Sequence, residues 1–210
     1  MIVTIPENIS DITLGQFQQL TEILKSQPAD FDNQKVKIFT GFSDDELACI
    51  ASADFNRIST AIDTALSVDV QFKHTFKMNG IEFGFIPNLD KITMREFTNL
   101  GLYGVAPETL HNLMAILFRP ITRRIGEDYD IEPYQGTDEW AEKMRGMPLN
   151  IVNGSLVFFC NLARELTTAT QKFSTMKPKR ASRQRATSRG SVGIQPLKNW
   201  LKTTFSKLIK

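Results

Sequence analysis

The sequence is poor in the side chains on which most metal centres depend. It has two cysteines, Cys49 and Cys160, and two histidines, His74 and His111. A zinc site needs such ligands clustered at short spacing, and these four are far apart, so we expect no metal site. Both cysteines lie in apolar, helix-forming stretches, which is typical of buried thiols in a reducing compartment.

Long apolar runs are also missing. The most apolar stretch, from Ile151 to Ala163, covers about 13 residues and is interrupted by Asn153, Gly154 and Ser155, whereas a membrane span needs roughly 20. The first residues, Met-Ile-Val-Thr-Ile-Pro-Glu-Asn, lack the basic start and apolar core of a signal peptide. We therefore expect no membrane insertion and a protein that stays in the cytosol.

No catalytic motif can be identified. Gly101 and Gly104 do not follow a strand as a phosphate-binding loop would, and no serine or cysteine has a base placed near it by a known motif. We therefore expect that the protein is not an enzyme and that it binds no cofactor. Of the two histidines, His74 is expected to pack on an apolar face and His111 to lie at the surface beside Glu108.

The carboxylates between Glu127 and Glu132 are the only other candidates for chemistry. They alternate with Tyr129 and Ile131, and they lack the ligand spacing and the sharp-turn glycine of a calcium loop. We interpret them as a solvated acidic loop, with a cation site or a hydrolase centred on Asp128 and Asp130 as the alternatives.

Acidic side chains are missing from the last part of the chain. Residues 166–210 contain 11 Lys and Arg and no Asp or Glu, whereas residues 1–165 contain 14 Lys and Arg against 23 Asp and Glu, a net charge of −9. This segregation indicates a charged partner, or a basic segment that folds back on its own acidic body.

The apolar pattern predicts an α+β fold that is predominantly helical, with helices packed around a central apolar helix over residues 148–171. Pro148 suits the first position of that helix. Its apolar residues recur at spacings of three and four and widen into a face that requires burial on several sides. They include Ile151, Val152, Leu156, Phe159, Leu162, Ala163 and Leu166.

Capping boxes mark the start of other helices. Three pairs have the required side chains three residues apart, namely Thr13 with Gln16, Ser43 with Glu46, and Thr93 with Glu96. The segments 5–20 and 86–100 both read Ile-Pro, a polar turn, Ile-Thr and a capping box, which either an internal duplication or convergent capping chemistry explains. Further stripes predict a helix ending before Gly41 and helices over 55–66, 107–118 and 137–145.

One β-hairpin is expected over residues 72–86. Its strands alternate apolar and polar residues, and Asn79-Gly80 between them suits a two-residue type I′ turn that places Met78 opposite Ile81. Residues 121–135 alternate weakly and fit either a short strand pair or a long ordered loop. Ile2 to Ile5 can form a short strand.

The chain is thus divided into a folded domain over 1–173, a basic flexible linker over 174–195, and a short amphipathic docking helix over 196–210. The basic arm can contact nucleic-acid phosphates, lie on an anionic membrane, or place its terminal helix in a partner's groove. The side chains expected to bind a partner are Lys179, Arg180, Arg183, Arg185, Arg189, Leu197, Trp200, Leu201, Phe205 and Leu208.

Three segments together resemble small morphogenesis proteins of tailed bacteriophages, closest to tail assembly chaperones and minor virion proteins. They are residues 83–100, residues 113–120, and residues 134–137 through 148–166. The resemblance covers residues 5–170 and leaves out the basic segment from Ser174. It implies a mainly helical module that shields a long partner such as a tape-measure protein, or an adaptor in the particle.

The resulting hypothesis is a non-enzymatic assembly factor in the host cytoplasm that binds other phage structural proteins. The alternative is a component retained in the virion, whose basic arm contacts packaged DNA or neighbouring subunits. Association with further copies of the same chain is compatible with both.

Overall fold

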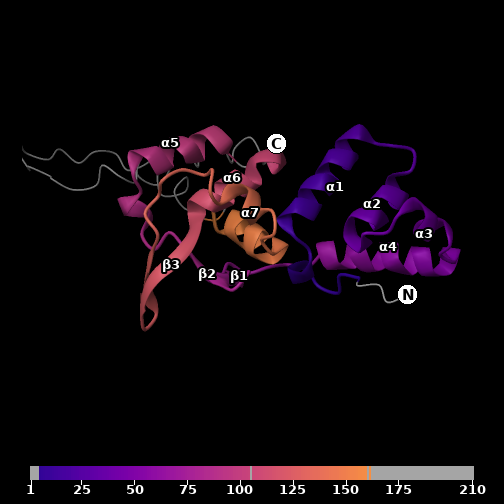
Figure 1. Ribbon diagram of the computed structural model, residues 1–210, viewed down its shortest axis with the longest axis horizontal. Coiled ribbons are helices and arrows are strands. Elements are labelled where there is room, and N and C mark those ends of the chain that lie inside the picture. The colour runs from indigo at the N-terminus through magenta and orange to yellow at the C-terminus, as the bar shows by residue number, and fades with distance from the viewer. Residues whose placement is uncertain (1–4, 105, 160, 162–210) are drawn as a thin grey trace, which may run out of the picture.

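The computed structural model describes residues 5–104, 106–159 and 161, which form an α+β arrangement of two groups of elements (Figure 1). The first group is helical: α1 (Leu14–Ser26), α2 (Phe31–Thr40), α3 (Asp44–Ala48) and α4 (Ser52–Leu66). The second group contains β1 (Thr75–Met78), β2 (Ile81–Phe85), α5 (Met94–Tyr103), α6 (Leu110–Leu117), β3 (Phe118–Ile125), β4 (Asp128–Ile131) and α7 (Ala141–Met144). A further helix spans residues 149–159.

All three predicted capping boxes are confirmed. Before α1, the Gln16 backbone N–H donates to Thr13 Oγ1 at 3.3 Å, while the Thr13 backbone N–H donates to Gln16 Oε1 at 2.9 Å. The same reciprocal bonds begin α3 and α5. The two similar segments also match in structure, because a 3-10 helix precedes each box, Ile9–Asp11 in one and Leu89–Lys91 in the other.

The predicted hairpin is confirmed in its register. Met78 lies opposite Ile81 and Phe76 opposite Phe83, and the turn residues Asn79 and Gly80 have φ values of 51° and 77°. These positive values are the reason that an Asn-Gly pair suits this turn.

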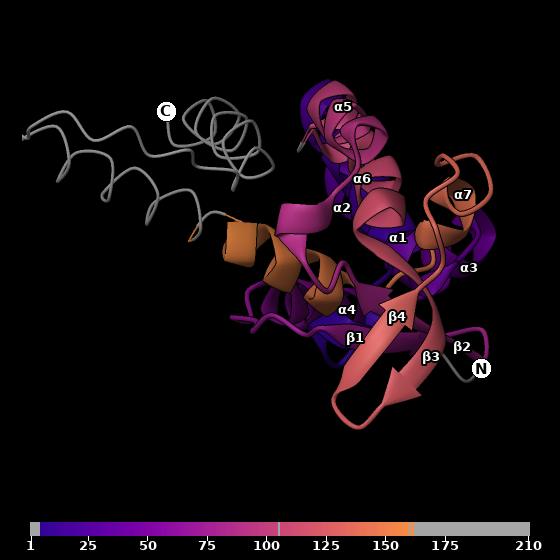
Figure 2. The same cartoon turned by 90° about the vertical axis from the view of Figure 1, so that its left-hand side faces the viewer.

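The expectation of a single hairpin is wrong, because β1 and β2 belong to a four-stranded antiparallel sheet of order β1-β2-β3-β4. A strand pair was one of the two readings of residues 121–135, but β3 begins earlier, at Phe118. The first part of β3 pairs with β2 and the second part with β4, and Pro120 lies where the partner changes. Figure 2 shows the β3–β4 hairpin extending away from the helices.

The most enclosed helix is α6, not the helix that begins after Pro148. Seven of the eight residues of α6 are buried, and the helix contacts α1, α5 and α7. The helix over 149–159 buries one face, including Ile151, Val152 and Phe159, but leaves Val157 exposed. α6 runs directly into β3. The helix therefore contacts the sheet on one side and other helices on the remaining sides.

The prediction for Cys49 is also wrong. This residue caps the short helix α3, which buries none of its own residues, and its thiol is free and exposed. Cys160 lies outside the described residues.

Several expectations concern residues outside the described part of the chain. These are most of the Ile2–Ile5 strand, the end of the 148–171 helix, the linker over 174–195, the docking helix over 196–210, and all ten partner-binding side chains named above. Ile5 itself is described and is not in a strand. Within the described residues, no helix combines the length and the hydropathy of a membrane span.

Candidate functional site

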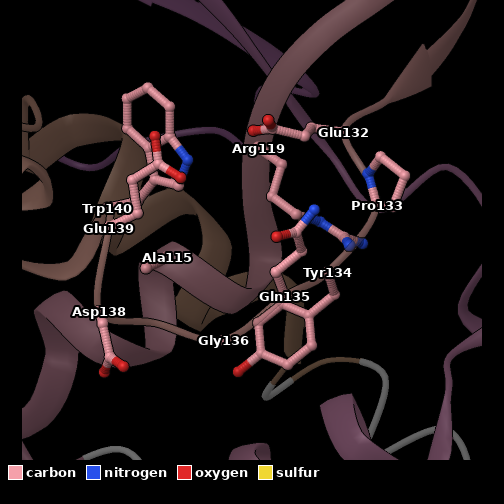
Figure 3. A pocket seen from close by; sticks show the side chains of 10 residues that line it. All are labelled: Ala115, Arg119, Glu132, Pro133, Tyr134, Gln135, Gly136, Asp138, Glu139 and Trp140. Atoms are coloured by element: carbon pink, nitrogen blue, oxygen red, sulfur yellow. The ribbon is translucent and has the colours of Figure 1, made fainter.

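A pocket of about 170 Å³ opens where β3 leaves α6 (Figure 3). Three segments form it: α6 contributes one residue, the start of β3 another, and the loop over residues 132–140 the rest. We call it the acidic pocket. Its lining residues are Ala115, Arg119, Glu132, Pro133, Tyr134, Gln135, Gly136, Asp138, Glu139 and Trp140.

The path of the 132–140 loop is fixed at Thr137. This residue is buried, its side-chain oxygen lies 3.1 Å from the Tyr103 hydroxyl, and its carbonyl accepts from the backbone N–H groups of Trp140 and Ala141. Gly136 has a φ of 136°, a backbone conformation that residues with a Cβ atom rarely adopt. The loop therefore holds Tyr134 and Trp140 in defined positions on either side of the pocket.

Arg119 and Glu96 form a buried ion pair beside the pocket. Arg119 Nη2 lies 2.6 Å from Glu96 Oε1, and the two side chains are 8% and 4% exposed. The other Glu96 oxygen accepts from the backbone N–H and the hydroxyl of Thr93, at 2.6 and 2.7 Å. Burial lowers the pKa of Arg119, and the Glu96 carboxylate opposes that shift. The pair thus connects α5 to β3.

Two aromatic rings of the pocket already contact cations. The Tyr134 ring centroid lies 5.6 Å from Arg119 Cζ, and its hydroxyl accepts from the Asn99 side chain at 2.6 Å. The Trp140 ring has the Lys143 ammonium 4.0 Å from its centroid. Burial raises the pKa of Tyr134, so its hydroxyl stays protonated at neutral pH. Both rings therefore already interact with cations of the protein itself.

The remaining charges of the pocket are carboxylates. Within the described part of the chain, Glu132, Asp138 and Glu139 make no ion pair. Figure 3 shows the Glu132 carboxylate directed toward the Trp140 side of the pocket, whereas that of Asp138 is directed away. With Arg119 paired to Glu96 and Arg95 Cζ 5.9 Å from the Tyr134 centroid, the lining residues still include more acids than bases, which favours a cationic ligand.

A second buried polar cluster surrounds His111, for which the predicted surface position is wrong. His111 is buried where α1, α6 and α7 meet, with Gln18 on one ring nitrogen and Arg145 and Glu142 near the other. Gln18, far away in the sequence, provides the polar partner that makes this burial tolerable. We interpret the cluster as a structural connection between the two groups of elements.

The prediction for His74 is also wrong, because the residue is exposed just before β1 begins. The centroid of its ring lies 4.7 Å from that of Phe72, with the two rings edge to face.

The acidic residues of 127–132 are divided by the structure. Glu127, Asp128 and Asp130 are exposed on the β3–β4 hairpin, where Asp130 lies opposite Arg123, while Glu132 joins the acidic pocket. No three His, Cys, Asp or Glu side chains come together as a metal site among the residues that the structure describes.

Comparisons of the chain with protein-family models, with curated proteins and with solved structures find no match.

Proposed function

We propose that this chain is a non-enzymatic morphogenesis protein of a tailed bacteriophage, similar in role to a tail assembly chaperone. It binds an apolar segment of a structural partner, for example a tape-measure protein. The resemblance over residues 5–170 supports the class of protein. The observation that carries the binding role is an apolar face on α5.

The outer face of α5 presents two large apolar side chains to solvent. Met94 is 74% exposed and Leu102 is 72% exposed, and the small residues Thr98 and Gly101 are exposed between them. The opposite face of the helix buries Leu100 against the protein. Two large side chains flanking a low stretch suit an apolar helix laid across α5, as in helix-in-groove recognition. Full burial of each of them contributes about 1.5–3 kcal/mol.

Co-purification tests this proposal. The tagged chain is expressed during infection, and phage structural proteins that co-purify are quantified by mass spectrometry. Met94→Lys combined with Leu102→Lys is expected to abolish recovery of the partner. Leu24→Lys combined with Val68→Lys is the matched control, because both residues are exposed apolar side chains outside α5. Equal recovery with both double variants contradicts the proposal.

The second candidate function is a virion component whose basic arm contacts packaged DNA or neighbouring subunits. The observation that favours it is the run of 11 Lys and Arg without an acid over residues 166–210. Contacts with phosphates make DNA affinity fall steeply with salt concentration. Deletion of residues 174–210 is expected to reduce both the affinity and this salt dependence, and an unchanged affinity with an unchanged salt dependence rejects this function.

A further inference from the structure

The lining of the acidic pocket contains three carboxylates and one cation, Arg119, and Arg95 lies beside it with its Cζ 5.9 Å from the Tyr134 ring centroid. Arg119 is paired with Glu96 at 2.6 Å, and of the three lining carboxylates that of Glu132 is directed toward the Trp140 side of the pocket, whereas that of Asp138 is directed away. We propose that the pocket binds a Lys or Arg residue from the chain's own basic segment, residues 177–189. This segment contains six Lys and Arg and no acid. The inference goes beyond the proposed function and does not depend on it.

The pocket contains a buried hydrogen-bond donor that requires an acceptor from the ligand. Arg119 is only 7% exposed, and its Nε–H has no hydrogen-bond partner among the described residues. A buried donor of this kind requires an acceptor. A Lys or Arg residue in a peptide brings backbone carbonyl oxygens, which can accept this hydrogen bond, together with its cationic side chain.

The size and the walls of the pocket suit one long side chain. Its volume of about 170 Å³ is smaller than that of a typical small-molecule site and suits a single long side chain. Trp140 and Tyr134 provide apolar ring surfaces for the methylene stem. Lys143 already lies 4.0 Å from the Trp140 centroid and Arg119 Cζ lies 5.6 Å from that of Tyr134, so the ligand's charge is matched by the pocket carboxylates.

The chain itself contains a basic segment close in sequence to the folded domain. Residues 1–165 have a net charge of −9, and the basic segment follows them in the same chain. The residues between Asn161 and Lys177 span roughly 35 Å if the predicted helix continues to residue 171, whereas a domain of this size has a radius of gyration of about 15 Å. The segment is therefore long enough to fold back onto the domain. A tethered ligand also has a high effective concentration, which favours the chain's own segment over that of a second copy.

The experiment uses Trp140 as the reporter in the full-length chain with Trp200→Phe, which makes Trp140 the only tryptophan. Acrylamide quenching of its fluorescence is measured at low and high NaCl. Salt screens the exposed carboxylates and releases the segment, so we expect the quenching constant to rise about twofold between about 0.05 and 0.5 M NaCl. Glu132→Gln with Glu139→Gln is expected to give high quenching at both salt concentrations.

Two further variants make the result specific. Glu127→Gln with Asp128→Asn removes the same charge from the β3–β4 turn, outside the pocket, and is expected to keep the salt response. Substitution of Arg180, Arg183 and Arg185 by Gln leaves every described residue unchanged. This variant is expected to lose the salt response of Trp140 quenching. Thermal unfolding of each variant verifies that it is folded.

Three results overturn the proposal. The first is a pocket variant that keeps the salt response of the parent protein. The second is a parent protein whose Trp140 quenching does not change with salt. The third is a salt response that grows with protein concentration, because the occupant then comes from a second copy of the chain.

Discussion

The Gln18 side-chain amide lies 3.0 Å from His111 Nδ1 and connects α1 to α6 across 93 residues of sequence. The orientation of this amide is fixed, because its nitrogen also donates to the Pro107 carbonyl at 2.7 Å and its oxygen accepts from Arg145 at 2.8 Å. The amide nitrogen is therefore the donor toward His111, and Nδ1 must be an acceptor without a proton. The two groups of elements are joined by a histidine that the fold keeps neutral.

This geometry predicts a loss of stability in mild acid. Burial lowers the pKa of His111, and the nearby Arg145 charge lowers it further. The unfolded histidine, with a pKa of about 6.5, takes up a proton before the folded one, so the free energy of unfolding falls as pH decreases below about 6.5. Urea unfolding between pH 8 and pH 5 measures this decrease. His111→Gln is expected to flatten it and His74→Gln to leave it unchanged, and equal slopes in all three proteins disprove the assignment.

Gly84 is expected to be intolerant of even a methyl group. A Cβ on Gly84 would overlap the Tyr129 ring, with Cδ2 at 2.8 Å, and the Tyr129 hydroxyl donates to the Phe85 carbonyl at 2.9 Å. Gly84→Ala therefore displaces the ring and is expected to lower the free energy of unfolding by about 1–3 kcal/mol. Chemical denaturation measures the loss. In a Tyr129→Ala background the same substitution should cost much less, and an equal cost in both backgrounds would falsify the contact.

Gly154 allows the helix over 149–159 to approach the chain before β1. A Cβ at this position would lie 2.6 Å from the Gln71 carbonyl oxygen and 3.0 Å from its carbon, which are backbone atoms that cannot rotate away. Gly154→Ala is expected to destabilise the protein by about 1–3 kcal/mol, although alanine is the better helix former. Val157→Ala, at an exposed position of the same helix, is the control and should change stability by less than about 0.5 kcal/mol. A stabilising effect of Gly154→Ala contradicts this close approach.

The Arg119–Glu96 pair is expected to be costly to break from one side. Glu96→Gln leaves the Arg119 charge buried without its partner at 2.6 Å, which costs about 3–5 kcal/mol. Combining it with Arg119→Met removes the unpaired charge and should recover a large part of the loss. Denaturant midpoints of the two variants and the parent protein provide the comparison. A double variant as unstable as Glu96→Gln would contradict this assignment, because Gln at position 96 can keep the Thr93 cap as Gln16 keeps that of Thr13.

The sequence was sufficient where structure depends on neighbouring residues. Capping boxes and the Asn79-Gly80 turn are defined by side chains three or fewer positions apart, and all were predicted correctly. The end of α6 was not, because the helical apolar pattern runs on through Phe118 and the change to strand depends on pairing with β2.

The candidate site could not be predicted in the same way. Glu96, Arg119 and Tyr134 come from α5, β3 and a loop, and no local pattern indicates that they meet. His111 was placed at the surface because its immediate neighbours include acids, while the distant Gln18 decides its burial. In both cases the missing information is a tertiary contact between polar side chains.

We propose that this protein acts by binding a structural partner through α5. The most direct test is quantitative mass spectrometry of the tagged chain purified from infected cells, with the parent protein beside the Met94→Lys and Leu102→Lys double variant. The account predicts that a phage tail structural protein is recovered at a fixed ratio with the parent chain and is lost with the variant. Recovery of no phage structural protein with the parent chain, or the same ratio with both chains, would contradict it.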